Sequence, residues 1–255
     1  MTHPYRTLAS NHYLSTQIGL IREWQSKDVV SFSQLVDFTA VECARESHAR
    51  SGAQKPSYTA FVVDAIARSL RDHPKLNRIV YRSLTRYRWV QLENIDVAVA
   101  VEAVDGDVDI AYASIIRNAD RLGTDGIMDA LRKLSRLPLD DPQFKRIRSL
   151  PASIAALLAR ATGLHPRTWV EFRGGSCAVT SPAKYGVEGV IVKSPWPLQF
   201  AFGYVKPRAM VVEEQCVPRL SAMLSLSWHR ELTTGAVAAR FFEEVVQGLQ
   251  HACSS

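Results

Sequence analysis

The feature that most constrains the fold is a switch of hydrophobic period between two neighbouring segments. Residues 57–72 carry apolar side chains at helical spacing, and Ser57 can cap the amides of the first turn. The apolar face of this segment consists of Phe61, Val62, Ala65, Ile66 and Leu70. Residues 95–101 instead alternate between larger apolar side chains and alanines, which is typical of a strand. We therefore expect an amphipathic helix packed on a sheet.

Further segments alternate irregularly between the two periods. We expect strands over residues 29–36, 108–116, 199–205, 209–213 and 222–228. We expect helices over 37–45, 123–134, 153–161 and 236–249, near-helical spacing over 15–24, and loops over 47–56 and 137–142. No repeat or clear domain boundary interrupts the chain. The pattern predicts one domain over residues 1–255, an α/β or α+β sandwich in which helices cover one side of a mixed sheet.

A full hydrophobic core is within reach of this chain, because 47% of its 255 residues are hydrophobic and 22% are charged. The formal net charge of +6 and the isoelectric point near 9.2 raise the question of a nucleic-acid partner. The basic residues are dispersed, however, and even the densest stretch, residues 75–88, includes Tyr81, Leu84 and Tyr87. We interpret that stretch as an edge strand with a solvated face and expect no nucleic-acid partner.

The cysteines and the apolar runs bear on the compartment. Cys43, Cys177, Cys216 and Cys253 are widely separated and form no C-x-x-C pair, which favours a reducing, cytoplasmic setting. The first residues lead into polar sequence, and no run reaches the ~18 apolar residues that a membrane span needs. The histidines do not cluster with cysteines or carboxylates. We expect neither secretion nor membrane insertion, and no metal site.

Four strings occur in a fixed order along nearly the whole chain. Residues 58–77 begin Y-T-A-F-V-V-D-A and end H-P-K-L-N, and residues 94–120 begin N-I-D-V-A-V-A-V and end I-I-R-N-A-D. Residues 175–187 read G-S-C-A-V-T-S-P-A-K-Y-G-V, and residues 224–241 read L-S-L-S-W-H-R-E-L-T-T-G-A-V-A-A-R-F. In this order the strings resemble the catalytic domain of the dihydrolipoyl acyltransferases, the 2-oxoacid dehydrogenase acyltransferase family. More distantly, they resemble chloramphenicol acetyltransferase.

The resemblance implies a chloramphenicol-acetyltransferase-like sandwich that forms a homotrimer, with each active site between two subunits. It also implies an acyl donor and an acceptor that enter the site from opposite sides. The family's lipoyl domain and peripheral-subunit-binding domain have no counterpart in residues 1–255, so we expect a standalone catalytic domain without a covalently bound cofactor. The acyl group would arrive on coenzyme A, which suits a basic surface, or on an acyl carrier or lipoyl domain of another protein.

The last string departs from the family's D-H-R-x-x-D-G signature. In the family the histidine of this signature deprotonates the acceptor, the second aspartate supports the local structure, and a hydroxyl in the third string steadies the oxyanion. Aligned without a gap, Arg230 occupies the histidine position, His229 the first aspartate, Thr234 the second aspartate, and Thr180 the hydroxyl position. A guanidinium is permanently protonated, so Arg230 cannot be the base.

One hypothesis is that His229 takes over as the base through a one-residue slip, with a β-bulge after Trp228 re-aiming its side chain. Thr180 would then stabilise the oxyanion. Candidate substrate-binding residues are Ser181, Arg230 and Thr234. The alternative is that His229 only packs at the end of a strand, while Arg230 and Glu231 form a surface pair. In a regular strand, the slip would turn His229 to the opposite face.

Three functions are compatible with this sequence. The first is an acyltransferase that moves an acyl group, acetyl in the simplest case, from a thioester to a hydroxyl or thiol of a small molecule in specialised metabolite biosynthesis. The second is a non-catalytic trimeric core or binding protein that lost the base. The third is a fold repurposed for cyclisation or elimination on a polyketide-like substrate, with Arg230 polarising a carbonyl or holding a carboxylate.

Overall fold

The computed structural model describes residues 16–17, 21, 25, 27–52, 54–82, 87–105, 108–136 and 149–254. The loop expected over residues 137–142 lies outside these ranges, as does most of the segment expected to be helical over residues 15–24.

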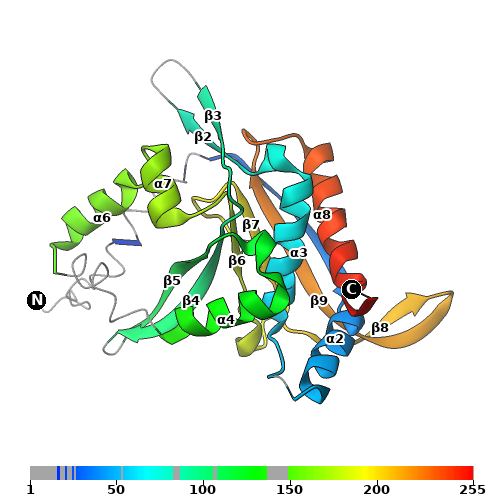
Figure 1. Ribbon diagram of the computed structural model, residues 1–255. Coiled ribbons are helices and arrows are strands. Elements are labelled where there is room, and N and C mark those ends of the chain that lie inside the picture. The colour runs from blue at the N-terminus through cyan, green and yellow to red at the C-terminus, as the bar shows by residue number, and fades with distance from the viewer. Residues whose placement is uncertain are drawn as a thin grey trace, which may run out of the picture.

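A mixed sheet forms the centre of the fold (Figure 1), as predicted. Its strands lie in the order β1-β9-β7-β6-β4-β5, and β8 pairs with β9. β6 is parallel to β4 and to β7, and the other pairs are antiparallel. The bounds of the strands are β1 (Val29–Asp37), β4 (Val97–Asp105), β5 (Val108–Ile116), β6 (Cys177–Thr180), β7 (Leu198–Phe202), β8 (Lys206–Val212) and β9 (Gln215–His229).

One layer of helices covers one face of this sheet. The layer contains α2 (Thr39–Arg50), α3 (Tyr58–Asp72), α4 (Gly123–Arg136) and α8 (Gly235–Gln250), and α3 contacts both α4 and α8. The hydroxyl of Ser57 caps α3 by accepting from the amide of Ala60 at 3.2 Å, which confirms the predicted helix start. α2 continues to Arg50, past the helix expected over residues 37–45. The main core lies between this layer and the sheet, where Phe200, Phe202 and Phe241 are almost fully buried.

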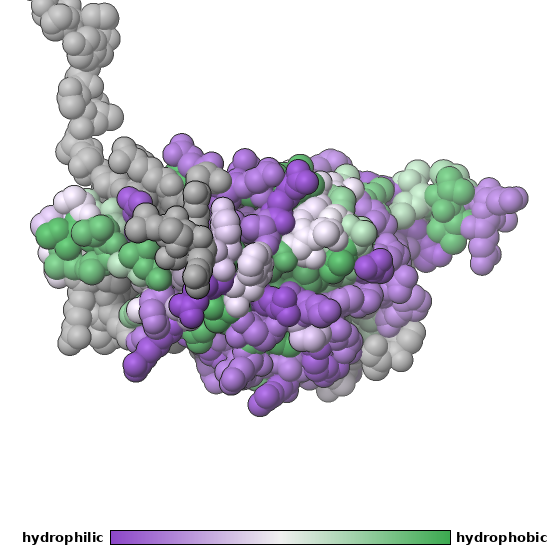
Figure 2. Space-filling view, turned by 90° about the horizontal axis from the view of Figure 1, so that it is seen from above, coloured by the Kyte–Doolittle hydropathy of each residue, from purple (hydrophilic) through white to green (hydrophobic). Residues whose placement is uncertain are grey.

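Two further helices, α6 (Ala152–Ala161) and α7 (Pro166–Arg173), lie apart from this layer (Figure 1), so the prediction of helices on one side was incomplete. α7 was not among the helices expected from the sequence, although proline stands at its first helical position, after an extended His165. Hydrophobic surface appears at this end of the molecule in Figure 2, where Leu157 of α6 is 65% exposed.

β2 (Arg78–Arg82) and β3 (Tyr87–Gln91) pair with each other in a separate two-stranded sheet, so the stretch predicted as one edge strand over residues 75–88 contains β2 and the start of β3, outside the main sheet. The side chain of Asn77 closes the base of this hairpin by donating to the carbonyls of Leu92 at 3.1 Å and Asn94 at 2.9 Å. These two bonds hold the ends of the hairpin together. They involve a residue that the hydrophobic period does not reveal.

The corner between α7 and β6 depends on two glycines. Gly174 has a φ of +76°, which favours glycine, and a Cβ on Gly175 would lie 1.9 Å from the carbonyl oxygen of Asp96. Asp96 is itself fixed, because its carboxylate accepts from Arg117 at 2.7 Å and from the amide of Asn118 at 2.9 Å. These contacts form a tight turn before β6.

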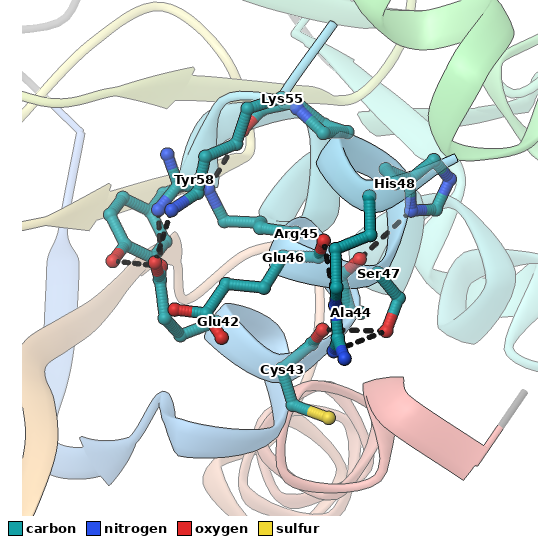
Figure 3. Close-up of polar contacts among 11 residues, drawn as sticks. Glu42, Cys43, Ala44, Arg45, Glu46, Ser47, His48, Lys55 and Tyr58 are labelled. Atoms are coloured by element: carbon teal, nitrogen blue, oxygen red, sulfur yellow. Dashed lines mark hydrogen bonds and ion pairs between the residues drawn. The ribbon is translucent and has the colours of Figure 1, made fainter. Parts of the chain in front are cut away.

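A charged cluster fastens α2 to the start of α3 (Figure 3). The carboxylate of Glu42 accepts from Arg45, Lys55 and the hydroxyl of Tyr58, and the guanidinium of Arg45 lies 3.8 Å from the centroid of the Tyr58 ring. Burial by itself would raise the pKa of Glu42, but the hydrogen bonds from Lys55, Tyr58 and Arg45 outweigh it and lower the pKa from 4.5 to about 2.

A disulfide between Cys43 and Cys253 joins α2 to the end of the described chain, with 5.9 Å between the two Cα atoms. The sequence did not reveal this pair because 210 positions separate the two cysteines. Structural disulfides are rare in reducing compartments, so the cytoplasmic setting stays a prediction. No helix within the described ranges combines the length and the apolar character needed to cross a bilayer.

Glu42→Gln removes the negative charge of Glu42 from this cluster and keeps the shape of the side chain. Near pH 7 we expect the variant to lose about 1–3 kcal/mol of unfolding free energy, because its bonds to charged donors weaken. The folded-state pKa lies below the ordinary value of 4.5, so the wild-type advantage is complete above that pH and fades as the pH falls towards 2. Urea denaturation of both proteins across this range measures the effect. A stability difference that does not change with pH would contradict it.

Gly175→Ala tests the glycine corner. We expect a loss of more than ~2 kcal/mol of unfolding free energy, because the new Cβ overlaps the backbone of Asp96 and forces it to shift. Gly248→Ala in α8 is the matched control, because its Cβ would lie at an ordinary 3.5 Å from Ala65. The control is expected to gain up to ~1 kcal/mol from helix propensity. Chemical denaturation compares the two, and a wild-type stability of Gly175→Ala would show that the close approach is dispensable.

Candidate active site

The alternation of β9 decides where His229 lies. Leu224, Leu226 and Trp228 belong to the main core, and the ring centroid of Trp228 lies 4.5 Å from that of Phe32. Successive side chains of a strand point to opposite faces, so His229 faces away from the helical layer. β9 pairs with β1 in regular register up to His229 opposite Val29, so the bulge of the slip hypothesis is absent from this strand.

The second face of the sheet carries small and polar side chains beneath the segment 187–197. The hydroxyl of Ser225 donates to the carbonyl of Val190 at 2.6 Å, and the side chains of Ser194 and Gln199 bond to each other. Ser225 of β9 and Gln199 of β7 thus hold this segment against the sheet, and the segment ends beside His229.

His229 itself is buried, with 3% of its surface exposed. Its amide donates to the carbonyl of Pro197 at 3.0 Å, and its Nε2 lies 3.1 Å from the carbonyl oxygen of Ser194. A carbonyl oxygen only accepts hydrogen bonds, so this contact places a proton on Nε2. The strand and the segment together therefore fix both the position and the orientation of the imidazole.

His229 lines a cavity of about 360 Å³ at the end of β9. The cavity lies between the β2–β3 hairpin, the α6–α7 pair and the segment 187–197 of the chain. Its lining is mostly apolar and comprises Lys27, Ile79, Val80, Tyr81, Leu157, Arg160, Ala161, Gly163, Leu164, Trp169, Pro195, Pro197, His229 and Glu231. A mostly apolar cavity with a few polar groups is typical of a small-molecule site.

Hydrogen bonds hold the walls of this cavity in place. Arg173 of α7 donates to the hydroxyl of Thr162 at 2.8 Å and to the carbonyl of Ala159 at 3.0 Å, which ties α7 to the end of α6. The indole of Trp196 donates to the carbonyl of Arg173 at 2.9 Å, and the indole of Trp169 donates to that of Gly175 at 3.0 Å. The two helices and the segment 187–197 therefore form one connected wall.

The turn after His229 is also fastened. Glu231 forms an ion pair with Lys27, and its carbonyl accepts from the indole of Trp89 at 3.1 Å. Arg230 is 66% exposed, and its guanidinium lies 3.6 Å from the carboxylate of Asp28. The residue at the family's histidine position thus points to solvent, while its neighbour His229 lines the cavity.

The remaining predicted site residues lie elsewhere in this chain. Thr234 precedes α8 as an exposed N-cap residue whose side chain makes no capping bond. The hydroxyl of Ser181 donates to the carbonyl of Phe202 at 2.9 Å and accepts from the amide of Ala183 at 3.3 Å, so it shapes a turn. Their roles in substrate binding, like that of Arg230, stay predictions.

Thr180 and His229 are separated within one chain. Thr180 is paired with Ala201, and Ala201 with Ser225, which stands four residues before His229 on β9. Four residues span about 13 Å along a strand, and two strand spacings add about 10 Å across the sheet. These two side chains can therefore serve one reaction only if they come from different subunits.

Most residues of the cavity lining could not be predicted from the sequence. Trp169, Arg160 and Pro195 come from separate segments, and no spacing connects them with His229. The only local signal was Pro195-Trp196-Pro197, which indicates a rigid segment but not its neighbours. Among the residues that the structure describes, no three His, Cys, Asp or Glu side chains are grouped as metal ligands would be.

Residues 17–141 match the model of the 2-oxoacid dehydrogenases acyltransferase family, catalytic domain. This match includes the first two strings and ends before the altered signature. One relative is the dihydrolipoyllysine-residue acetyltransferase component of the pyruvate dehydrogenase complex of Rickettsia typhi, which is 24% identical over 98% of this chain and 56% of its own length. The corresponding component of Mycoplasma capricolum is 23% identical over 78% of this chain and 39% of its own length. The chain thus spans about half, or less, of the length of these curated relatives.

Solved structures of the same kind share the fold. A probable dihydrolipoamide acetyltransferase of Listeria monocytogenes has a TM-score of 0.69 at 18% identity, covering 98% of this chain and 96% of its own. A truncated catalytic core of the 2-oxoacid dehydrogenase multienzyme complex of Thermoplasma acidophilum also has a TM-score of 0.69, at 20% identity over 97% of this chain and 99% of its own. Taken together, the family match, the relatives and the fold make this chain similar to the catalytic domain of the 2-oxoacid dehydrogenase acyltransferases.

Proposed function

We propose that this chain is an acyltransferase that moves an acyl group from a thioester to a hydroxyl or thiol of a small molecule, with His229 as the general base. The observation that carries the proposal is the burial of His229 in the lining of an apolar cavity, with its Nε2 hydrogen-bonded to the carbonyl of Ser194. Arg230, at the position of the family's base, supports this assignment because it is exposed and permanently charged.

The reaction follows from the proposed role of His229. The imidazole takes the proton of the acceptor's O–H or S–H, and the acceptor atom bonds to the carbonyl carbon of the thioester. The resulting oxyanion collapses, the C–S bond breaks, and the departing thiolate takes the proton back from the imidazolium. The Ser194 carbonyl favours this cycle because its hydrogen bond strengthens when the ring becomes positively charged.

The oxyanion in this proposal is stabilised by Thr180 of a neighbouring subunit. A hydroxyl donor placed where negative charge develops is most effective in a site that excludes water. The separation of Thr180 and His229 in one chain supports a closed ring, in which the Thr180 end of one subunit meets the His229 end of the next. We take this ring to be the homotrimer that the family resemblance implies.

The acyl donor in this proposal is an acylated coenzyme A or an acylated carrier, including a lipoyl domain. The net charge of +6 supports an anionic donor, because dispersed basic residues attract phosphates over the whole surface. The acceptor is a small molecule, as the cavity beside His229 suggests, and we place the reaction in specialised metabolism.

His229→Ala and Arg230→Ala distinguish the two candidate bases. We expect His229→Ala to lower kcat by roughly 10²–10⁴-fold, because general-base catalysis is lost, and Arg230→Ala to stay within about twofold of wild type. Release of free coenzyme A thiol from acetyl-coenzyme A, in the presence of dihydrolipoamide or a phenolic acceptor, measures turnover. Circular dichroism checks the fold of both variants. Undiminished turnover by His229→Ala would remove its role as base, and absence of wild-type turnover with every acceptor would favour a non-catalytic trimeric core.

Thr180→Val tests the shared site. We expect this variant to lose about 10²–10³-fold in kcat, because valine keeps the shape but lacks the hydroxyl. Refolding an equimolar mixture of Thr180→Val and His229→Ala should then restore about a quarter of wild-type activity, since random assortment joins an intact Thr180 to an intact His229 at that fraction of interfaces. Each variant refolded alone is the control. A mixture no more active than its components would contradict a site built by two subunits.

A further inference from the structure

The wall of the His229 cavity is unusually suited to rings. The indole of Trp169 is 5% exposed and is held by its bond to Gly175, and the prolines 195 and 197 stand in the segment that Trp196 anchors to α7. Trp and proline side chains are rigid, so they lose little conformational entropy when they contact a ligand. Such walls favour a flat apolar molecule over a flexible polar one.

The charges of this cavity do not cancel. Lys27 is paired with Glu231, whereas Arg160 forms no ion pair with any carboxylate in the described ranges. Among the Lys, Arg, Asp and Glu side chains described in the lining, Arg160 therefore carries the one positive charge that no carboxylate offsets. A guanidinium in this situation is matched by a carboxylate or another planar anion, which it can bind with two parallel hydrogen bonds.

The size and the mouth of the cavity limit the range of possible ligands further. About 360 Å³ lies near the lower end of the range of small-molecule sites, roughly 300–1,000 Å³, and is suited to one or two rings rather than to a whole coenzyme. Leu157 and Leu164 also line the cavity and are 65% and 78% exposed, so they form an apolar rim at the end where Figure 2 shows hydrophobic surface. An apolar rim with a single cation admits a molecule with an apolar body and one anionic group.

We propose that this cavity binds a small ring-containing molecule with one anionic group, which Arg160 holds while the hydroxyl or thiol of the molecule lies at His229. The proposal rests on the proposed function and names the class of its acceptor. Trp169 and the prolines contact the rings, Arg160 selects the anion, and His229 contacts the reacting atom.

Isothermal titration calorimetry with two matched probes tests the proposal without any acyl donor. The probes are 6-hydroxy-2-naphthoate and 2-naphthol, which share the rings and the hydroxyl and differ by the carboxylate. We expect the wild type to bind the naphthoate at least about tenfold more tightly than the naphthol, as one charge-assisted contact allows. Arg160→Gln should abolish this preference and leave the binding of 2-naphthol unchanged.

Two further variants complete the experiment. Arg167→Gln on α7 is the matched control, because Arg167 lines a different cavity and should leave the preference intact. Ala161→Phe fills the cavity and should weaken both probes by at least about tenfold, with the fold checked by circular dichroism. Equal binding of the two probes to the wild type, no binding of either, or a preference that survives in Arg160→Gln would overturn the ligand class.

Acyl transfer is measured separately, so the two proposals can fail independently. If the naphthoate binds through Arg160 and no acceptor is acylated, the binding site stands and the proposed function fails. If other acceptors are acylated in a His229-dependent reaction while neither probe binds, the function stands and the ligand class is wrong.

Discussion

The strict two-face geometry of β9 is the constraint on which the rest of the site depends. In the last part of this strand, Leu224, Leu226 and Trp228 enter the main core, while Ser225, Ser227 and His229 occupy the other face. Because β9 keeps its regular pairing with β1 up to the last residue, the face of His229 is as firmly determined as that of Trp228. Moving either side chain to the other face would require breaking the core or the ladder.

The cavity on the second face of the sheet depends on the segment that covers this face. No helix of the main layer lies there. The segment 187–197 is bonded instead to β9, β7 and α7, through Ser225, Gln199 and Arg173. These are hydrogen bonds rather than large apolar contacts, and they leave a cavity at the end of the strand. The same bonds orient the imidazole, so the cavity and the orientation of His229 have a common structural cause.

The similarity to the acyltransferase family is compatible with the altered signature for a physical reason. The strings at residues 58–77 and 94–120 lie within the family match and form the central helix α3 and the strand β4. The altered string at the end of β9 lies outside that match. Arg230 is exposed beside Asp28, so the fold tolerates it, whereas a buried guanidinium would need a partner. Similarity to the family and the proposed catalytic residue therefore reside in different parts of the chain.

Hydrophobic period and turn chemistry predicted the local elements well. The cap at Ser57, the strand at residues 97–101, the hairpin that follows it and the terminal helix are all confirmed, because each depends on neighbours in sequence. The alternation Leu-Ser-Leu-Ser-Trp-His also indicated that His229 and Trp228 point to opposite faces of the sheet. The sequence also showed that Arg230 cannot act as the family's base, because that follows from the guanidinium alone.

Only the tertiary structure determined which residues from distant segments come into contact. The Asn77 clamp under the β2–β3 hairpin, the Cys43–Cys253 bond and the cavity around His229 join residues from distant segments, and no period or spacing encodes such contacts. The hypothesis of a bulge after Trp228 was wrong, because β9 pairs with its partner strand β1 in regular register up to His229. Sequence thus determined which face each side chain takes, and packing determined what lies on that face.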